Sequence, residues 1–319
     1  MSRAEPKPAY NSARRIKWLA FSIVIVLGVY VSGWFFIADR VNSVVQTTIE
    51  RLRADGVDIN CPDQDVRGFP FRMGVFCSDF DVVASSEALA IDGGALRSAA
   101  QIYDPTRAVI EVDAPLSVDF GDEALKLDYA IGQAVVEARA PGRRALSVEF
   151  RDGSGSDGDF TAEWDRLTAF SRESDGNLEL AIQGIALTSD AADVPPLNVD
   201  ADALLSDASF ETRSLRGKTG KIRRLAVQLN EDRGLLANGP FSVSTDGLLD
   251  ADLTIRVVDV PGIVDDLNRT APHIASAVGG ILQLSPLSGE NGDEVELEVT
   301  IRAGEAKIGI IPLGTIPPL

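Results

Sequence analysis

The sequence predicts a mainly β protein with a few helices, in which an N-terminal transmembrane helix precedes an antiparallel, curved sheet of the meander type. Three observations predict this fold. An uncharged apolar run lies near the N-terminus, at residues 18–37. From about residue 57, short runs of alternating apolar and polar residues follow one another between Gly, Asp and Pro. Few helical patterns lie between these runs, so βαβ units are not expected. The pattern leaves open one large domain or two sub-sheets.

The apolar run at residues 18–37 is long enough to cross a bilayer. Its 20 residues cover ~30 Å as a helix, at ~1.5 Å per residue. The tail at residues 1–17 carries five basic residues and one acid, which places the N-terminus in the cytoplasm and the rest of the chain across the membrane. A cleaved signal peptide is the alternative. The run is long for one, and Trp34-Phe35-Phe36 suits a peptidase site poorly, so an uncleaved single-pass anchor is expected.

Residues 38–56 predict an amphipathic helix that continues from the span. Val41, Val44, Val45, Ile49 and Leu52 recur at helical spacing, and Gly56 ends the run. We expect this apolar stripe to pack on the sheet.

Residues 57–319 predict the β-rich domain. The clearest strand patterns are residues 73–77, 108–112, 145–150, 178–182, 225–229, 253–257 and 295–299. Turns are expected at residues 92–94, 174–177 and 246–247. A late helix is expected to begin near Pro261, and a second amphipathic turn covers residues 274–281. Pro195-Pro196 marks residues 190–200 as the candidate boundary between two halves.

The charge and the cysteines limit the function and the compartment. The formal net charge is −18, which argues against binding nucleic acid or anionic headgroups, because both need clustered Lys and Arg. Cys61 and Cys77 are the only cysteines. In an oxidising compartment they predict a disulfide that stabilises by roughly 3 kcal/mol. In the cytosol, two reduced thiols are expected instead.

No motif for catalysis, a cofactor or a metal emerges. A catalytic triad would need the single histidine, His273, which is expected to be a capping or half-exposed residue. The glycines Gly153, Gly155 and Gly158 match a dinucleotide fingerprint in letters only, because β patterns flank them, and they are interpreted as a flexible loop. The same loop has a faint calcium pattern, with Asp152, Ser154, Ser156 and Glu163 as candidate ligands, but Asp157 stands where glycine is required.

One short segment stands out because it has a distinctive composition and lies between the two cysteines. Arg67, Gly68, Phe69, Pro70 and Arg72 lie between the two cysteines. Gly68 and Pro70 suit a turn, and the arginines can pair with Asp63 or Asp65. The element is therefore a candidate functional or structural turn.

With the C-terminal segment at residues 301–314, this element resembles domain-of-unknown-function family 2125, of alphaproteobacterial single-span envelope proteins. The resemblance implies an inner-membrane protein with a periplasmic C-terminal domain and implies no activity. Residues 241–253 are similar to AsmA-like envelope proteins, which implies a long curved sheet with an apolar inner face and a role in lipid handling.

The expected function is that of a non-enzymatic, membrane-anchored periplasmic protein, held in the bilayer through residues 18–37, that binds lipid or another envelope component. An assembly scaffold that binds an envelope protein is the first alternative. A hydrolase with an unrecognised site is the second. Nucleic acid is not an expected partner.

Overall fold

The computed structural model describes residues 12–84, 88–121, 123–140, 142–190, 195–212, 214–230, 233–270 and 294–319. Over these residues the chain forms two helices and a single antiparallel sheet of 19 strands. This confirms the mainly β fold with a curved antiparallel sheet. The helices are α1 (Ser12–Ala54) and α2 (Val260–Thr270). The strands are β1 (Val57–Asn60), β2 (Asp65–Arg67), β3 (Arg72–Cys77), β4 (Phe80–Ala84), β5 (Leu89–Gly93), β6 (Leu96–Gln101), β7 (Asp104–Val112), β8 (Leu116–Asp119), β9 (Ala124–Ala140), β10 (Arg143–Ser156), β11 (Thr161–Ser174), β12 (Asn177–Ser189), β13 (Leu197–Leu205), β14 (Thr219–Asn230), β15 (Arg233–Val243), β16 (Leu249–Val258), β17 (Val295–Arg302), β18 (Glu305–Ile308) and β19 (Ile311–Thr315).

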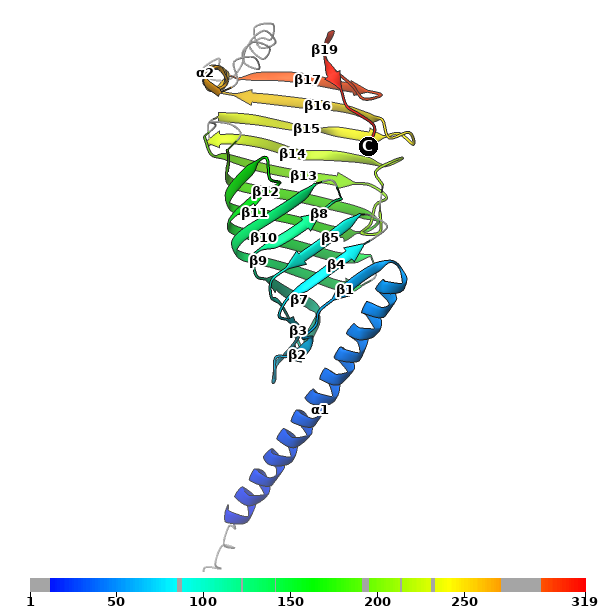
Figure 1. Cartoon of the computed structure of the whole chain (residues 1–319), viewed down its shortest axis with the longest axis vertical. Coiled ribbons are helices and arrows are strands. Elements are labelled where there is room, and N and C mark those ends of the chain that lie inside the picture. Colours follow the sequence, from blue (N-terminus) through cyan, green and yellow to red (C-terminus); the bar gives the residue numbers. More distant parts are fainter. Residues whose placement is uncertain are drawn as a thin grey trace, which may run out of the picture.

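Helix α1 is continuous over 43 residues, so the apolar run and the amphipathic stretch belong to one helix. It is long and apolar enough to cross a membrane. The helix ends where Gly56 adopts a left-handed φ of 86°, a conformation that glycine reaches without steric cost. Figure 1 shows α1 projecting away from the sheet, at the end of the molecule opposite β17.

Strands β9 to β19 form a sequential meander, in which each strand pairs with the next one along the chain. Figure 1 shows these strands stacked one above another. The pairing of β12 with β13 continues the sheet across residues 190–200. We call strands β9 to β17 the wall.

Strand β9 is long enough to pair with two strands on its other edge. Its residues 124–127 pair with β8, and its residues 132–137 pair with β7. Two arms therefore leave β9. One arm continues from β7 through β6 and β3 to β2. The other continues from β8 through β5 and β4 to β1. We call these two arms the foot. Figure 1 shows α1 leading into it.

The far end of the wall is covered by α2. Val260, Ile263 and Val264 pack with Val257, Val295 and Leu297 of the last strands, and Val295 is fully buried. Arg233 of β15 donates to Asp259, just before this helix, at 2.5 Å, and to Asp266 within it, at 2.8 Å. The late helix is thus present. The turn expected at residues 274–281 lies outside the described residues, and so does His273.

One expectation was wrong. Residues 151–159 do not form a loop throughout, because β10 runs to Ser156 and the turn to β11 comes after it. The glycines have a packing role. A Cβ at Gly153 would lie 2.9 Å from the Trp164 ring, and one at Gly155 would lie 3.3 Å from it. Their missing side chains leave the space that the indole fills.

Candidate functional site

The inner face of the sheet carries continuous rows of apolar residues. One row crosses β7 and all of β9 to β17 without a polar side chain. Its directly paired members are Ile110, Ala134, Val148, Ala169, Ile182, Ala201, Leu225, Ala237, Ile255 and Leu297. Directly paired residues point to the same face. At ~4.8 Å per strand this row is roughly 43 Å long.

A second apolar row runs beside the first, two residues further along each strand. Its members are Val112, Gly132, Phe150, Leu167, Gly184, Val199, Val227, Leu235, Val257 and Val295. Together the two rows make an apolar strip along the whole wall, which we call the apolar strip.

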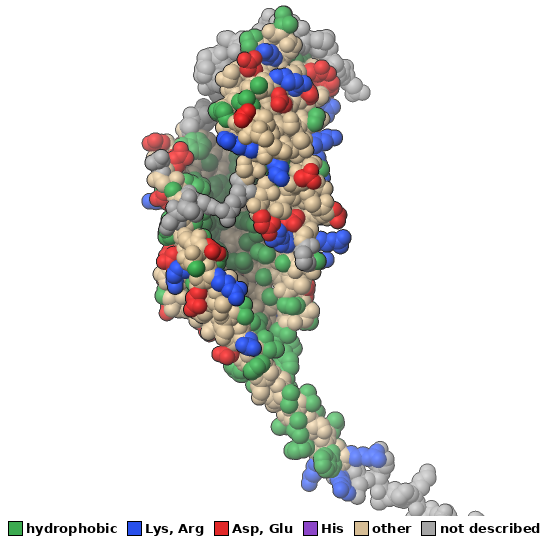
Figure 2. Space-filling model, turned by 90° about the vertical axis from the view of Figure 1, so that its right-hand side faces the viewer, with side chains coloured by type: hydrophobic (Ala, Val, Ile, Leu, Met, Phe, Trp, Pro, Cys, Tyr) green, Lys and Arg blue, Asp and Glu red, His purple; other side chains and the backbone are tan. Residues whose placement is uncertain are grey.

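The apolar strip is open to solvent near its middle. Ile182 is 51% exposed although it belongs to the row, and its neighbour Ala169 is also exposed. Figure 2 shows a hollow in the molecule, and most of the side chains inside the hollow are hydrophobic. At the far end the strip is covered by α2, and its last residues are buried. The strip is therefore a groove that is open in the middle and closed at the far end.

The opposite, outer face of the wall carries polar residues across β10 to β13. The residues adjacent to the first row include Glu149, Thr168, Gln183 and Asp200, which pair with one another across β10 to β13. This alternation puts polar side chains in water and apolar ones in the hollow.

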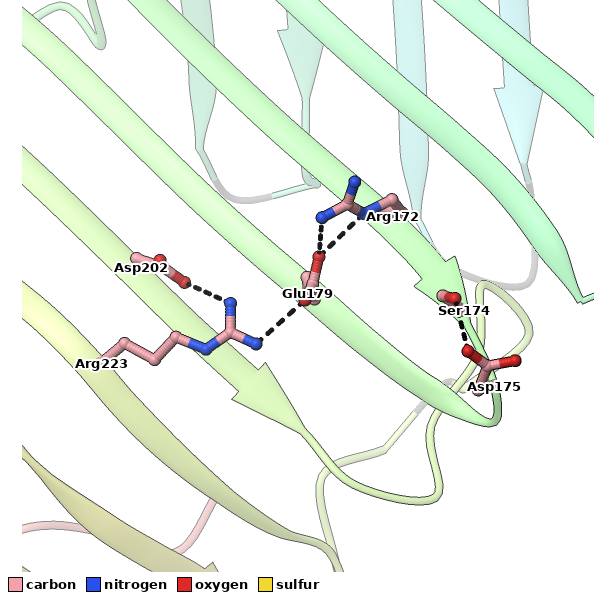
Figure 3. A network of polar contacts seen from close by, with 6 residues as sticks. All are labelled: Arg172, Ser174, Asp175, Glu179, Asp202 and Arg223. Carbon is pink, nitrogen blue, oxygen red and sulfur yellow. Dashed lines mark hydrogen bonds and ion pairs between the residues drawn. The ribbon is translucent and has the colours of Figure 1, made fainter.

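Ion pairs link the strands on the outer face, as Figure 3 shows. Glu179 accepts hydrogen bonds from Arg172, at 2.8 Å, and from Arg223, at 2.9 Å. Arg223 also approaches Asp202, at 3.5 Å. The hydrogen bonds from Arg223 and Arg172 lower the pKa of Glu179. These partly exposed pairs add little stability each, and together they keep the outer face charged.

Two buried donors lie next to Gly153, which pairs with Tyr129 on one side and with Trp164 on the other. Both side chains are 6% exposed. The Tyr129 hydroxyl and the Trp164 Nε1 have no hydrogen-bond partner among the described residues. Burial, with smaller contributions from Asp113 and Asp128, raises the pKa of Tyr129 to about 12. Tyr129 therefore stays protonated, and both groups are donors rather than acids.

Cys61 and Cys77 form the disulfide that the sequence predicted, with 5.5 Å between their Cα atoms. Cys61 follows β1 and Cys77 ends β3, so the bond joins the two arms of the foot. The sequence predicted the bond but not that it joins two arms. The two arms exist only because β9 pairs with both β7 and β8, and no pattern in the sequence indicated that pairing.

The turn at residues 67–72 packs against α1. Phe69 contacts Trp34, with ring centroids 5.5 Å apart, and Phe35, with centroids 6.3 Å apart. The Tyr30 hydroxyl donates to the Pro70 carbonyl, and Trp34 Nε1 donates to the Arg72 carbonyl at 3.3 Å. Gly68 adopts a φ of 118°, which favours glycine. The arginines differ, because Arg67 pairs with Asp65 at 2.9 Å, whereas the Arg72 guanidinium makes no ion pair in the described part of the chain.

Sequence reasoning missed the helix side of this contact. Tyr30, Trp34, Ala38, Asn42 and Gln46 are spaced four residues apart, so each lies beside the one before it, and together they form a stripe that winds slowly around α1. Trp34 and Ala38 are buried, and Gln64 bonds to both Asn42 and Gln46. The spacing was a readable signal, but it was hidden because Tyr30 and Trp34 also count as apolar residues of the span.

The residues of the faint calcium pattern are divided between two strands. Asp152, Ser154 and Ser156 belong to β10, and Glu163 belongs to β11. Asp157 uses its carboxylate within the turn, where it accepts from the amides of Asp159, at 3.1 Å, and Phe160, at 2.9 Å. Within the described ranges, no three His, Cys, Asp or Glu side chains are grouped to hold a metal ion. The arrangement as a whole suits binding of apolar groups.

The chain matches no curated protein and no solved structure. One family model matches residues 34–317, and its description is an uncharacterized protein conserved in bacteria, DUF2125. The match begins at Trp34, the residue that meets the turn, and extends to Pro317. Because it covers most of the sequence, the chain belongs to the DUF2125 family.

Proposed function

We propose that this protein is a non-enzymatic, membrane-anchored protein of the cell envelope that binds the acyl chains of lipids along its apolar strip. Helix α1 is the single-pass anchor in the inner membrane. The basic tail stays in the cytoplasm, and the sheet lies in the periplasm, where the Cys61–Cys77 bond is stable.

The observation that carries the proposal is the apolar strip, because it is continuous over ten strands and remains partly exposed at Ala169 and Ile182. Monomeric soluble proteins rarely leave a long apolar surface open to water. Covering such a surface with an apolar ligand is favourable by about 25 cal/mol per Å².

The dimensions favour acyl chains over a compact ligand. The first row is roughly 43 Å long, whereas the hydrocarbon of one leaflet is ~15 Å thick, half of a ~30 Å core. The strip therefore has room for the chains of more than one lipid. A sheet attached to a membrane-spanning helix is also next to a large supply of this ligand.

Site-specific photocrosslinking in the full chain tests this proposal. Ile182→p-benzoylphenylalanine places the probe in the groove, and Gln183→p-benzoylphenylalanine places it one residue away on the outer face. The chain is reconstituted into phosphatidylethanolamine vesicles and irradiated, and adducts are identified by mass spectrometry. We expect lipid adducts at position 182 and their loss at position 183.

A charge in the groove provides the second arm of the test. Ala169→Glu adds a carboxylate beside position 182 on the inner face, and Thr168→Glu adds the same charge on the outer face. We expect Ala169→Glu to abolish the adduct and Thr168→Glu to preserve it. Absence of lipid at position 182 in the unblocked chain would overturn the proposal. A discrete protein crosslinked there would instead favour the assembly scaffold.

A further inference from the structure

Two neighbouring turns of the foot expose a cluster of apolar side chains. Phe69 and Phe71 lie between β2 and β3, and they are 49% and 66% exposed. Ile102 and Tyr103 lie between β6 and β7, and they are 38% and 77% exposed. The Ile102 amide donates to the Phe71 carbonyl at 3.2 Å, which joins the turns. We call these four residues the apolar tip.

The apolar tip lies beside the part of α1 that is apolar enough to cross a membrane. Its turn contacts Tyr30 and Trp34, and both belong to the run that ends at Ile37. With a rise of ~1.5 Å per residue, Tyr30 is ~10 Å and Trp34 is ~4.5 Å inside that end of the run. If the run crosses the bilayer, the turn lies at the boundary between headgroups and hydrocarbon.

The polar groups of this turn are suited to that depth. The carbonyls of Pro70 and Arg72 accept from side chains of α1, and the Arg72 amide donates to the Gly68 carbonyl at 2.9 Å. Backbone groups at the edge of the hydrocarbon need such partners, since water is scarce there. Tyrosine rings such as that of Tyr103 are typical of this interface, and Phe71 adds apolar surface beside it. The Arg72 side chain next to them can reach lipid phosphates.

An apolar path leads from the apolar tip to the groove. Met73 follows Phe71 by two residues and is the second residue of β3, so the path starts next to the apolar tip in the chain. Met73 pairs with Ala100, which pairs with Ala108, and that residue pairs with Val136. Val136 pairs with Leu146 of the wall, beside the apolar strip. The path is thus continuous from the turn into the wall.

We propose that the apolar tip is a second membrane contact, which inserts into the leaflet on the sheet's side of the bilayer and opens the lower end of the groove to its acyl chains. This inference rests on the membrane anchor of the proposed function. The occupant is the lipid bilayer rather than a second copy of the chain, because the tip contacts the span itself and is level with its end.

The test places a photoreactive probe at one of two exposed phenylalanines in the full chain. Phe71→p-benzoylphenylalanine probes the tip. Phe120→p-benzoylphenylalanine is the matched control, because Phe120 is 57% exposed and follows β8. Asp119 connects through Ala90 and Val83 to Asp58, just after the end of α1. That end of the helix is ~25 Å beyond Ile37, so Phe120 follows a strand that is linked to the end of α1 remote from the span.

The chain is reconstituted into phosphatidylethanolamine vesicles, and flotation verifies that it is in the membrane. We expect lipid adducts at position 71 and no lipid adducts at position 120. Tyr103→p-benzoylphenylalanine, in the other turn of the tip, is expected to behave like position 71. Equal adducts at positions 71 and 120, or adducts of position 71 to a second copy of the chain, would overturn the inference.

The probe at position 182 separates this inference from the proposed function. Adducts at position 71 without adducts at 182 would support the membrane contact and contradict lipid binding in the groove. Adducts at 182 without adducts at 71 would support the groove and overturn the membrane contact. Loss of both, in a chain that floats with vesicles, would overturn both.

Discussion

The strands of the foot and the strands of the wall are held together in different ways. The wall uses strands of up to 17 residues, and each pairs with its neighbour in the sequence. The foot uses short strands such as β1 and β2, of four and three residues. Some of them pair with strands that are not their neighbours in the sequence, as β3 does with β6 although β4 and β5 lie between them. The wall is therefore held by local ladders, whereas the foot depends on the disulfide and on α1. The comparison shows that the cross-links are located where local pairing is weakest.

Removing Trp164 tests how far the wall depends on packing in addition to its ladders. Trp164→Ala leaves a cavity over Gly153 and Gly155, and we expect a loss of about 3–5 kcal/mol in the free energy of unfolding. Denaturant unfolding of the full chain in detergent measures it. Trp18→Ala is the control, because Trp18 is exposed on α1. A loss below about 1 kcal/mol would show that the ladders alone hold the wall.

Removing the disulfide tests the foot. In the variant with Cys61→Ser and Cys77→Ser, we expect a loss of about 3 kcal/mol in the free energy of unfolding. Hydrogen exchange should show lower protection for amides of β1 and β3 and unchanged protection for amides of β11 and β12. Adding reductant to this variant is the control and should change nothing further. Equal loss of protection in foot and wall would show that the two regions unfold together.

The contact between α1 and the turn gives a smaller effect. Tyr30→Phe keeps the ring beside Phe69 and removes the hydrogen bond to the Pro70 carbonyl, which should cost about 1 kcal/mol. Hydrogen exchange at the amides of Phe71 and Arg72 should report it. Tyr103→Phe removes the same atom from an exposed ring and should leave these amides unchanged. Unchanged hydrogen exchange at these amides in Tyr30→Phe would mean that ring packing alone holds the turn against α1.

A pH effect is expected at the edge of the wall. Hydrogen bonds from Arg144 and then Ser209 lower the pKa of Glu211 to about 2, against ~4.3 in an unfolded chain. Because the folded pKa is depressed, this stabilisation is fully present above about pH 4.3 and is lost as the pH falls towards 2. The effect is small, because Glu211 is exposed.

Comparison of the chain with its Glu211→Gln variant measures this effect. The unfolding midpoint of the unchanged chain should be slightly higher than that of the variant at pH 6. The difference between the two midpoints should decrease at pH 4 and again at pH 3. Glu123→Gln, in the turn before β9, is the control and should not reproduce the trend. A gap that stays constant down to pH 3 would contradict the assigned role of Arg144.

The foot and the wall also differ in how well the sequence predicted them. The strands of the wall follow from period-two patterns such as residues 178–182 and 253–257, and its turns follow from Asp-Gly signals. The loop expected at residues 151–159 failed, because Gly153 and Gly155 were interpreted for their flexibility and not for the space that they leave for Trp164. In the foot, the disulfide was predictable because the chain has two cysteines. The contact between the rings of Phe69 and Trp34 was not predictable, because those residues are far apart in the chain.

The sequence by itself determined the features that depend on neighbouring residues. These are the length of the apolar helix, the alternation along each strand, and the identity of the bonded cysteines. Only the tertiary structure decided that β9 serves two arms, that the turn at residues 67–72 lies beside Tyr30 and Trp34, and that Ile182 remains open to solvent. Alternation gives each strand an apolar face, but the register between strands decides which of those faces form one row. Register is selected jointly by the turns and by packing across the sheet, because a slip of one residue would move every apolar side chain of a strand to the other face.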